Sequence, residues 1–100
     1  MAEVKELRFH PDALDEADAA LEWYVVRSRA AAENFMQELE LAARRVLDAP
    51  TRWPRIDTLV RRYLLPTYPF SLIYRVGDDF VEVIAVAHQR RKPGYWRSRT

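Results

Sequence analysis

The chain has 100 residues, enough for one compact domain with a single core and too few for two. It contains no cysteine, which excludes disulfides and thiolate metal sites, and no apolar run approaches the roughly 20 residues of a membrane-spanning helix. The first residues also lack the basic start and apolar centre of a signal peptide, so we expect one domain over residues 1–100, located in the cytoplasm.

The net charge of +1 conceals an uneven distribution of charge along the chain. Residues 1–50 hold eleven acidic and six basic side chains, whereas residues 51–100 hold four acidic and ten basic ones. This asymmetry indicates an anionic partner for the second half. The alternative is internal neutralisation, in which acidic helices cover basic strands, and the two interpretations are compatible.

The first half predicts a short strand followed by a helix. Residues 4–9 read as the strand, and Pro11 stands where a first helical turn tolerates a missing N–H. Apolar side chains then recur every three or four residues, which predicts a helix over residues 11–28. The apolar positions are Leu14, Ala17, Leu21, Tyr24 and Val25, with a partial second stripe at Ala19, Trp23 and Val26.

A second helix is predicted over residues 30–49, after a break at Ser28 and Arg29. Pro50 ends it, because the residue before a proline is pushed out of the α region. The short connection predicts an antiparallel helical hairpin. The apolar positions with helical spacing are Ala32, Phe35, Met36, Leu39, Ala42, Ala43, Val46 and Leu47.

The period of the apolar residues changes to two after the connector at residues 51–57. Strands are predicted over residues 60–65, 70–76 and 80–88, the last two joined by a tight turn at Gly77-Asp78-Asp79. The last strand is nearly continuous in apolar residues, which is typical of the centre of a sheet. In the first of these strands Arg61 and Arg62 point to opposite faces, so only one can share a surface with Arg75, and we expect the other to pair with helical acids.

The order of these elements predicts an α+β domain of the type β-α-α-β-β-β. A helical hairpin packs on one face of a mainly antiparallel four-stranded sheet. The other face, with strand arginines and the start of the C-terminal segment, is the candidate working surface.

The segment after His88 combines cations and aromatic rings without an acid. That combination suits a polyanion whose bases can stack. The alternative is a solvated basic tail whose aromatics pack back on the domain. The side chains concerned are Arg90, Arg91, Lys92, Tyr95, Trp96, Arg97 and Arg99.

Three stretches that together span nearly the whole chain resemble one known superfamily. They are Phe9-His-Pro-Asp-Ala-Leu-Asp-Glu-Ala17 with Trp23-Tyr24; Trp53-Pro-Arg-Ile56 with Arg61-Arg-Tyr-Leu-Leu65; and Pro69-Phe-Ser-Leu-Ile-Tyr-Arg-Val76 with Ile84-Ala-Val-Ala-His-Gln-Arg-Arg-Lys-Pro-Gly-Tyr-Trp96. Each stretch alone is weak, but their ordered combination resembles the RelE/ParE superfamily of type II toxin–antitoxin toxins. The superfamily fold is the same helical hairpin on an antiparallel sheet.

The resemblance implies a small bacterial toxin held inactive by a cognate antitoxin. RelE-like members cleave mRNA in the ribosomal A site, whereas ParE-like members inhibit DNA gyrase without being nucleases. A toxin of either kind needs no cofactor, and two distant histidines without a cluster of acids make a poor metal site.

RNA cleavage by the 2′-OH requires a base, cations for the phosphate and an acid for the leaving oxygen. His88 at a strand end is the candidate base, and its alternative role is to hydrogen-bond the tail. The lysines that serve in RelE itself are missing, since the chain has only Lys5 and Lys92. The remaining candidates for a nuclease are Arg61, Arg62 and Arg75 as cations and Tyr95 as a proton donor or stacking ring.

We therefore interpret the chain as a ParE-like growth inhibitor acting on gyrase. A RelE-like ribosome-dependent mRNA endoribonuclease is the first alternative, and a non-toxic RNA-binding module is the second. Trp23 and Val26 are candidates for antitoxin contact, unless Trp23 packs under the N-terminal strand or against the connector at Trp53. The expected target-binding residues are Arg90, Arg91, Lys92, Tyr95, Trp96 and Arg97.

Overall fold

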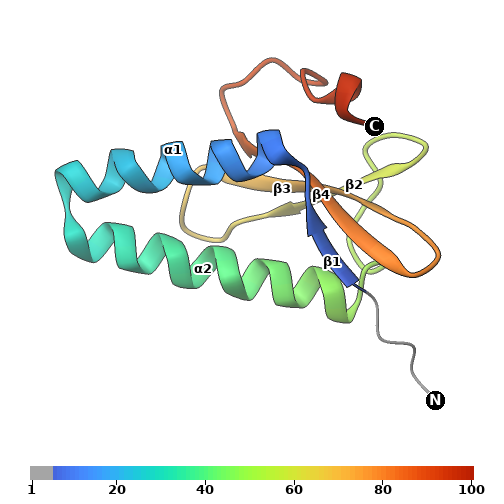
Figure 1. Cartoon of the computed structure of the whole chain (residues 1–100), viewed down its shortest axis with the longest axis horizontal. Coiled ribbons are helices and arrows are strands. Elements are labelled where there is room, and N and C mark those ends of the chain that lie inside the picture. Colours follow the sequence, from blue (N-terminus) through green and yellow to red (C-terminus); the bar gives the residue numbers. More distant parts are fainter. Residues whose placement is uncertain (1–5) are drawn as a thin grey trace.

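The structure is a computed structural model that describes residues 6–100; Val4 and Lys5, in the predicted first strand, lie outside the described residues. The strand β1 (Glu6–Phe9) is followed by the helices α1 (Pro11–Arg27) and α2 (Arg29–Asp48). Then come the strands β2 (Val60–Leu64), β3 (Phe70–Val76) and β4 (Phe80–His88) and a short 3₁₀ helix, η1 (Arg97–Arg99) (Figure 1). The predicted order of strands and helices is confirmed; η1 was not foreseen.

The helix boundaries are set by local signals in the sequence. The His10 side chain accepts a hydrogen bond from the backbone N–H of Asp12 at 3.1 Å, and Pro11 begins α1. Ser28 serves both helices: its backbone N–H donates to the carbonyl of Tyr24, and its hydroxyl accepts from the N–H of Ala31. Ser28 thereby ends α1 and caps α2, which produces the predicted hairpin.

The four strands lie in the order β1-β4-β3-β2, and only the β1–β4 pair is parallel. The prediction that the last strand is central is therefore confirmed. β1 pairs with β4 only as far as Phe9, which lies opposite Val83. The second half of β4, from Ile84 to His88, extends beyond this neighbour.

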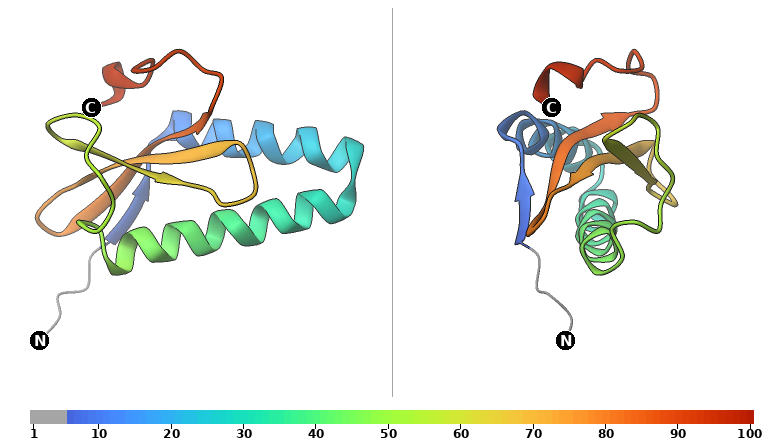
Figure 2. Two further views of the ribbon diagram at one scale, coloured as in Figure 1. Left: turned by 180° about the vertical axis from the view of Figure 1, so that it is seen from behind. Right: turned by 90° about the vertical axis from the view of Figure 1, so that its right-hand side faces the viewer.

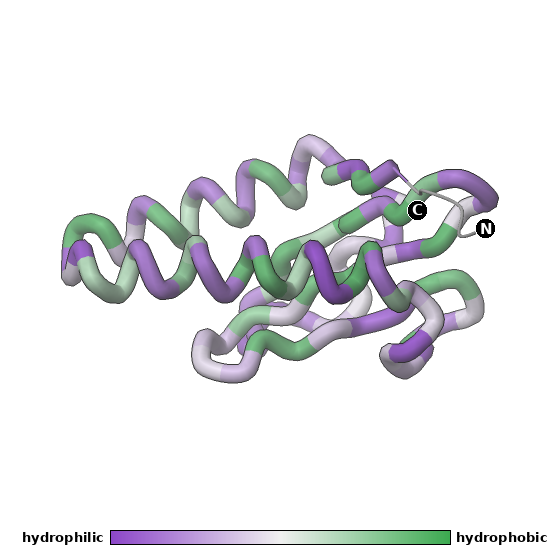
Figure 3. Tube along the Cα trace, turned by 90° about the horizontal axis from the view of Figure 1, so that it is seen from below, coloured by the Kyte–Doolittle hydropathy of each residue, from purple (hydrophilic) through white to green (hydrophobic). Residues whose placement is uncertain are grey.

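The main core lies between the helices and one face of the sheet. Phe35 is fully buried at its centre, with ring centroids 5.3 to 5.5 Å from those of Tyr24, Tyr68 and Phe70. Hydrophobic and hydrophilic segments alternate along both helices, as Figure 3 shows. The buried and partly buried apolar positions of α1 are Ala13, Ala17, Ala20, Leu21 and Tyr24.

The predicted apolar stripe of α1 was wrong at both ends, where Leu14 and Val25 are 49% and 57% exposed. The stripe that packs inward runs through Ala13 and Ala20. Each residue is rotated by about 100° from the one before it, so Leu14 and Val25 turn away from the core when Ala13 and Tyr24 face it.

The opposite face of the sheet, the candidate working surface, carries a second, smaller core. A register shift between Ile73 and Tyr74 leaves Ile84 as a bulge, and Ile84 and Ala85 both pack in this second core. The C-terminal Trp96 is only 4% exposed and covers these side chains. An apolar face of this kind is stabilised by such cover because it is removed from water.

Candidate functional site

The C-terminal segment, residues 89–100, leaves β4 and folds over the second core. It lies on the opposite side of the molecule from α2 and returns toward the start of α1 (Figures 1 and 2). Gly94 allows the turn in this segment, because its φ of 80° lies in the left-handed region that favours glycine. The path of the segment then depends on what holds its last residues.

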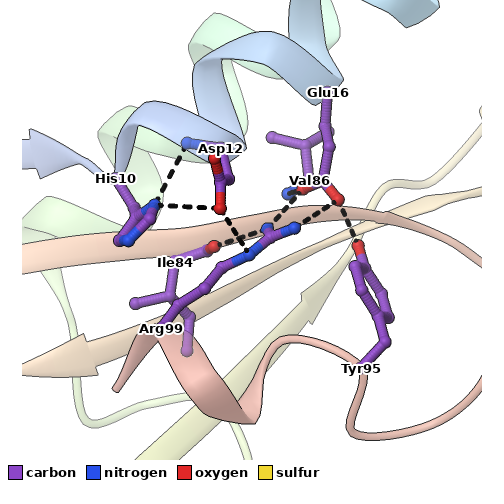
Figure 4. A network of polar contacts seen from close by, with 7 residues as sticks. All are labelled: His10, Asp12, Glu16, Ile84, Val86, Tyr95 and Arg99. Carbon is purple, nitrogen blue, oxygen red and sulfur yellow. Dashed lines mark hydrogen bonds and ion pairs between the residues drawn. The ribbon is translucent and has the colours of Figure 1, made fainter.

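Glu16 of α1 anchors the end of the C-terminal segment. Its carboxylate accepts two hydrogen bonds from the Arg99 guanidinium, at 2.9 and 3.2 Å, and one from the Tyr95 hydroxyl at 2.7 Å (Figure 4). Asp12 adds an oxygen 3.5 Å from Nε of Arg99. The Arg99 and Glu16 side chains are only 12% and 16% exposed, so this bidentate pair is shielded from water.

The same two side chains form hydrogen bonds with backbone groups on the unpaired edge of β4. Glu16 accepts the backbone N–H of Val86 at 3.0 Å, and Arg99 donates to the backbone carbonyl of Ile84 at 3.0 Å. These groups lie just past the point where β1 ends. Side chains from α1 and from the C-terminal segment, called the tail from here on, thus satisfy backbone groups that a longer β1 would have paired.

Hydrogen bonding and burial fix the protonation of Tyr95 and Arg99. Burial, followed by the hydrogen bond to Glu16, raises the pKa of the Tyr95 hydroxyl far above its ordinary value. The hydrogen bonds to Glu16 also raise the pKa of Arg99. The Tyr95 hydroxyl is therefore neutral, and its proton is donated to Glu16 in a hydrogen bond.

A second tether holds the tail from the other side. Nε of Arg97 donates to Asp57 at 3.2 Å, in the connector before β2. The backbone N–H of Thr58 and then Arg97 lower the pKa of the Asp57 carboxyl, which keeps it ionised. Both side chains are substantially exposed, so this ion pair contributes less than the Glu16–Arg99 pair.

Two hollows flank the tail, and the first lies between it and α1. We call it the helix groove; it has a volume of about 430 Å³ and mainly apolar walls. Trp23 and Tyr24 of α1 line one side and Arg91 and Tyr95 of the tail line the other. Trp23 is 53% exposed, and the Arg27 guanidinium lies 3.7 Å from the centroid of its ring.

The second hollow, of about 460 Å³, lies between the tail and the sheet; we call it the basic hollow. Its lining includes Arg62, Ser71 and Ile73 from β2 and β3, His88 from β4, and Lys92 and Arg97 from the tail. Because Nδ1 of His88 accepts the backbone N–H of Arg90 at 3.0 Å, the proton of its neutral imidazole sits on Nε2.

The structure brings only part of the predicted nuclease set together. Arg62, His88 and Tyr95 line the basic hollow. Arg61 instead donates to the backbone carbonyls of Thr51 and Trp53, at 3.1 and 2.6 Å. The expected pairing of this arginine with helical acids was therefore wrong: the connector lies closer than the helices do.

Arg75 shares the tail side of the sheet with Arg62, so the prediction that only one of Arg61 and Arg62 lies on its face is confirmed. It is held there by Glu82 of the neighbouring strand, with Nε and the carboxylate oxygen 2.8 Å apart. A cation paired in this way is largely neutralised.

The predicted target-binding residues divide into two groups. Arg90, Arg91 and Lys92 are exposed, and the Arg91 guanidinium stacks 3.9 Å from the centroid of the Tyr95 ring. Trp96 is buried, while Tyr95 and Arg97 hold the tail. Of the predicted antitoxin contacts, Trp23 and Val26 are 53% and 81% exposed, so Trp23 does not pack under β1 or the connector.

Sequence reasoning missed Glu16 and Arg99 as a unit. One signal was present: Glu16 lies three residues after buried Ala13 and four before buried Ala20, on the inward face of α1. A carboxylate there requires a partner, but nothing local identifies one that is 83 residues away in the sequence.

Fold and site together define a small α+β domain of the RelE/ParE type, with a helical hairpin on one face of the sheet and a tail tied across the other. Residues 7–93 match the family described as "ParE toxin of type II toxin-antitoxin system, parDE". The chain belongs to this ParE toxin family.

One solved structure with this fold is described as "Chromosomal ParDE TA system from P. aeruginosa". The match has a TM-score of 0.75 and covers 87% of this chain and 98% of that chain at 20% identity. No curated protein matches the chain. Within residues 6–100 no helix is long and apolar enough to span a membrane, and no group of three or more histidine, aspartate or glutamate side chains is placed to hold a metal ion.

We expect Glu16→Gln to loosen the tail. The amide oxygen can still accept the N–H of Val86, but its NH₂ group opposes Arg99. The free energy of unfolding should fall by roughly 2 kcal/mol. Amides of residues 95–100 should exchange with deuterium faster, as measured by mass spectrometry.

Asp57→Asn is the matched control, because it makes the same change at the exposed tether and keeps an acceptor for Thr58. It should alter stability little. Equal effects of the two substitutions would contradict the role assigned to Glu16.

Tyr95→Phe should reduce the loss of stability in alkali. The raised pKa means that the folded chain keeps this proton after the unfolded chain has released it. The contribution is fully present below about pH 10 and is lost as the pH rises further. Urea unfolding at neutral and alkaline pH measures it, and identical alkaline losses in both proteins would refute the assignment.

Proposed function

We propose that this chain is a growth-inhibiting toxin that acts on DNA gyrase and is neutralised by a cognate antitoxin. The membership of the ParE toxin family supports a toxin. The choice of gyrase over RNA depends on one observation: side chains that a nuclease would need are hydrogen-bonded to other parts of the fold. Tyr95 donates to Glu16, with its pKa raised, and Arg61 is held by backbone carbonyls.

None of the described residues that line the basic hollow is an aspartate or a glutamate, and the candidate acid Tyr95 is bonded to Glu16, which argues against proton transfer to a leaving oxygen. A general acid must reach the group that it protonates and must release its proton near the working pH. Tyr95 meets neither condition while it is bonded to Glu16. The exposed cations Arg90, Arg91 and Lys92 are free to contact a macromolecule without chemistry, and we assign them to target binding.

The second candidate function is a RelE-like mRNA endoribonuclease. It is favoured by one observation: Arg62 and His88 line the same hollow, and Nε2 of His88 is free of the contact that occupies Nδ1. In that case His88 would be the base and Arg62 would hold the phosphate. His88 is therefore essential if the chain is a nuclease and dispensable if it acts on gyrase.

Antitoxin binding is assigned to the helix groove and the exposed face of α1. Trp23 and Val26 expose apolar surface beside the groove, and isolated domains seldom leave such a patch uncovered. A large, half-exposed aromatic side chain at the edge of a groove is typical of residues that dominate binding energy.

Expression of the chain alone in a bacterial host should separate the two functions. A gyrase poison should cause a DNA-damage response and altered plasmid supercoiling and leave mRNA intact. His88→Ala should keep this toxicity. Cleaved mRNA together with loss of toxicity in His88→Ala would overturn the proposal in favour of the nuclease.

Trp23→Ala should keep toxicity and weaken neutralisation. Removing a half-exposed ring should leave the core intact and reduce antitoxin affinity by at least about tenfold. Titration of the purified toxin with the antitoxin encoded beside it measures this affinity. Leu59→Ala, at a 72% exposed leucine just before β2, is the control, and an equal loss there would refute the assignment.

A further inference from the structure

The basic hollow differs from its surroundings in charge. The chain has 15 acidic side chains, yet none of the described residues that line this hollow is an aspartate or a glutamate. Its charged lining residues are Arg62, Arg91, Lys92 and Arg97, and Arg97 is the one paired with a carboxylate, that of Asp57. The hollow is therefore a local concentration of positive charge in a nearly neutral protein.

Two arginines elsewhere on this side of the molecule are paired with carboxylates. Arg75 pairs with Glu82, and Arg99 pairs with Glu16. Within residues 6–100, by contrast, no carboxylate pairs with Arg62 or Lys92. Arg91 stacks on the Tyr95 ring, which leaves the N–H edges of its guanidinium available.

The floor of the hollow is apolar, and one apolar side chain stands among the cations at its rim. Ile73 and Ala87 are buried beneath it, and Leu64 is 53% exposed at its edge. A polar rim around an apolar centre is the usual composition of a surface that binds protein. Cations around an apolar floor complement a segment in which carboxylates flank an apolar side chain.

The rings of the tail do not suit a nucleic acid. Single-stranded nucleic acids bind by stacking bases on exposed aromatic rings along a cationic groove. Trp96 is 4% exposed, and the guanidinium groups of Arg91 and Arg99 lie 3.9 and 5.2 Å from the centroid of the Tyr95 ring.

We propose that the basic hollow binds an acidic peptide segment of a protein partner. Carboxylates of the segment meet Arg62, Arg91 and Lys92, and an apolar side chain packs against Leu64. This inference rests on the proposed function, because the partner is taken to be the protein that the toxin inhibits. To the proposed function it adds where the inhibited protein binds, in the basic hollow, and which side chains of that protein are recognised, carboxylates beside an apolar group.

The experiment uses the purified full chain and a labelled synthetic peptide of glutamate and leucine with serine spacers. Fluorescence anisotropy measures the affinity. We expect binding that weakens with added salt, and a loss of about tenfold in both Arg62→Glu and Lys92→Glu. Both side chains are exposed and unpaired in the described structure, so circular dichroism should show the folds unchanged.

Arg44→Glu is the matched control. It makes the same reversal of charge at an exposed arginine of α2 and should change the affinity less than about twofold. Equal losses in Arg44→Glu and Arg62→Glu would show general attraction to the protein and would overturn the proposal. So would equal binding of a peptide in which lysine replaces glutamate.

Two further outcomes also overturn it. A single-stranded RNA oligonucleotide that binds with the same dependence on Arg62, while the peptide does not bind, would make the hollow a nucleic-acid site. Self-association abolished by Arg62→Glu would make a second copy of the chain the occupant. The peptide assay contains no gyrase, so a peptide that does not bind would leave the proposal of gyrase inhibition untouched. Equally, a chain that does not inhibit gyrase could still bind the peptide, so the two failures can be told apart.

Discussion

The ion pair between Glu16 and Arg99 is the interaction on which the functional side of this molecule depends. β1 stops opposite Val83, which leaves the second half of the central strand β4 without a neighbour on that edge. Glu16 accepts four hydrogen bonds there, from Val86, Tyr95 and both terminal nitrogens of Arg99. A shielded ion pair is stabilising only when its remaining donors and acceptors are satisfied, and this one also satisfies backbone groups of β4.

This anchoring separates the charges of the tail into two classes. Arg97 and Arg99 are bound to carboxylates at Asp57 and Glu16, and they hold the segment in place. Arg90 and Lys92 project without such partners among the described residues, and Arg91 stacks on Tyr95. The cations of the tail therefore have two roles. Arg97 and Arg99 hold the segment in place, and Arg90, Arg91 and Lys92 form its exposed basic surface.

The two hollows share a wall, because His88, Arg91 and Tyr95 line both of them. The helix groove lies on the α1 side of this wall and the basic hollow lies on the sheet side. Any displacement of Arg91 or Tyr95 changes the shape of both. The assigned antitoxin and target surfaces are thus adjacent, and the hydrogen bond from Tyr95 to Glu16 limits how far their common wall can move.

The sequence by itself determined the elements and their order. Proline at the start of α1, Ser28 between the helices and the change of apolar period after the connector are local signals, and each was read correctly to within a residue or two. The strand alternation also predicted that only one of Arg61 and Arg62 shares a face with Arg75, and the strand pairing in the structure shows that it is Arg62. The central place of β4 followed from its continuous apolar run.

Only the tertiary structure decided which side chains are free to bind a partner. Whether Trp96 is a stacking ring or part of a core depends on the bulge at Ile84 and on the return of the tail across the sheet. The pairing of Glu16 with Arg99 joins residues 83 positions apart, and no local spacing encodes such a contact. Composition states how many cations a segment has, but their availability depends on the carboxylates and carbonyls that the fold brings within reach.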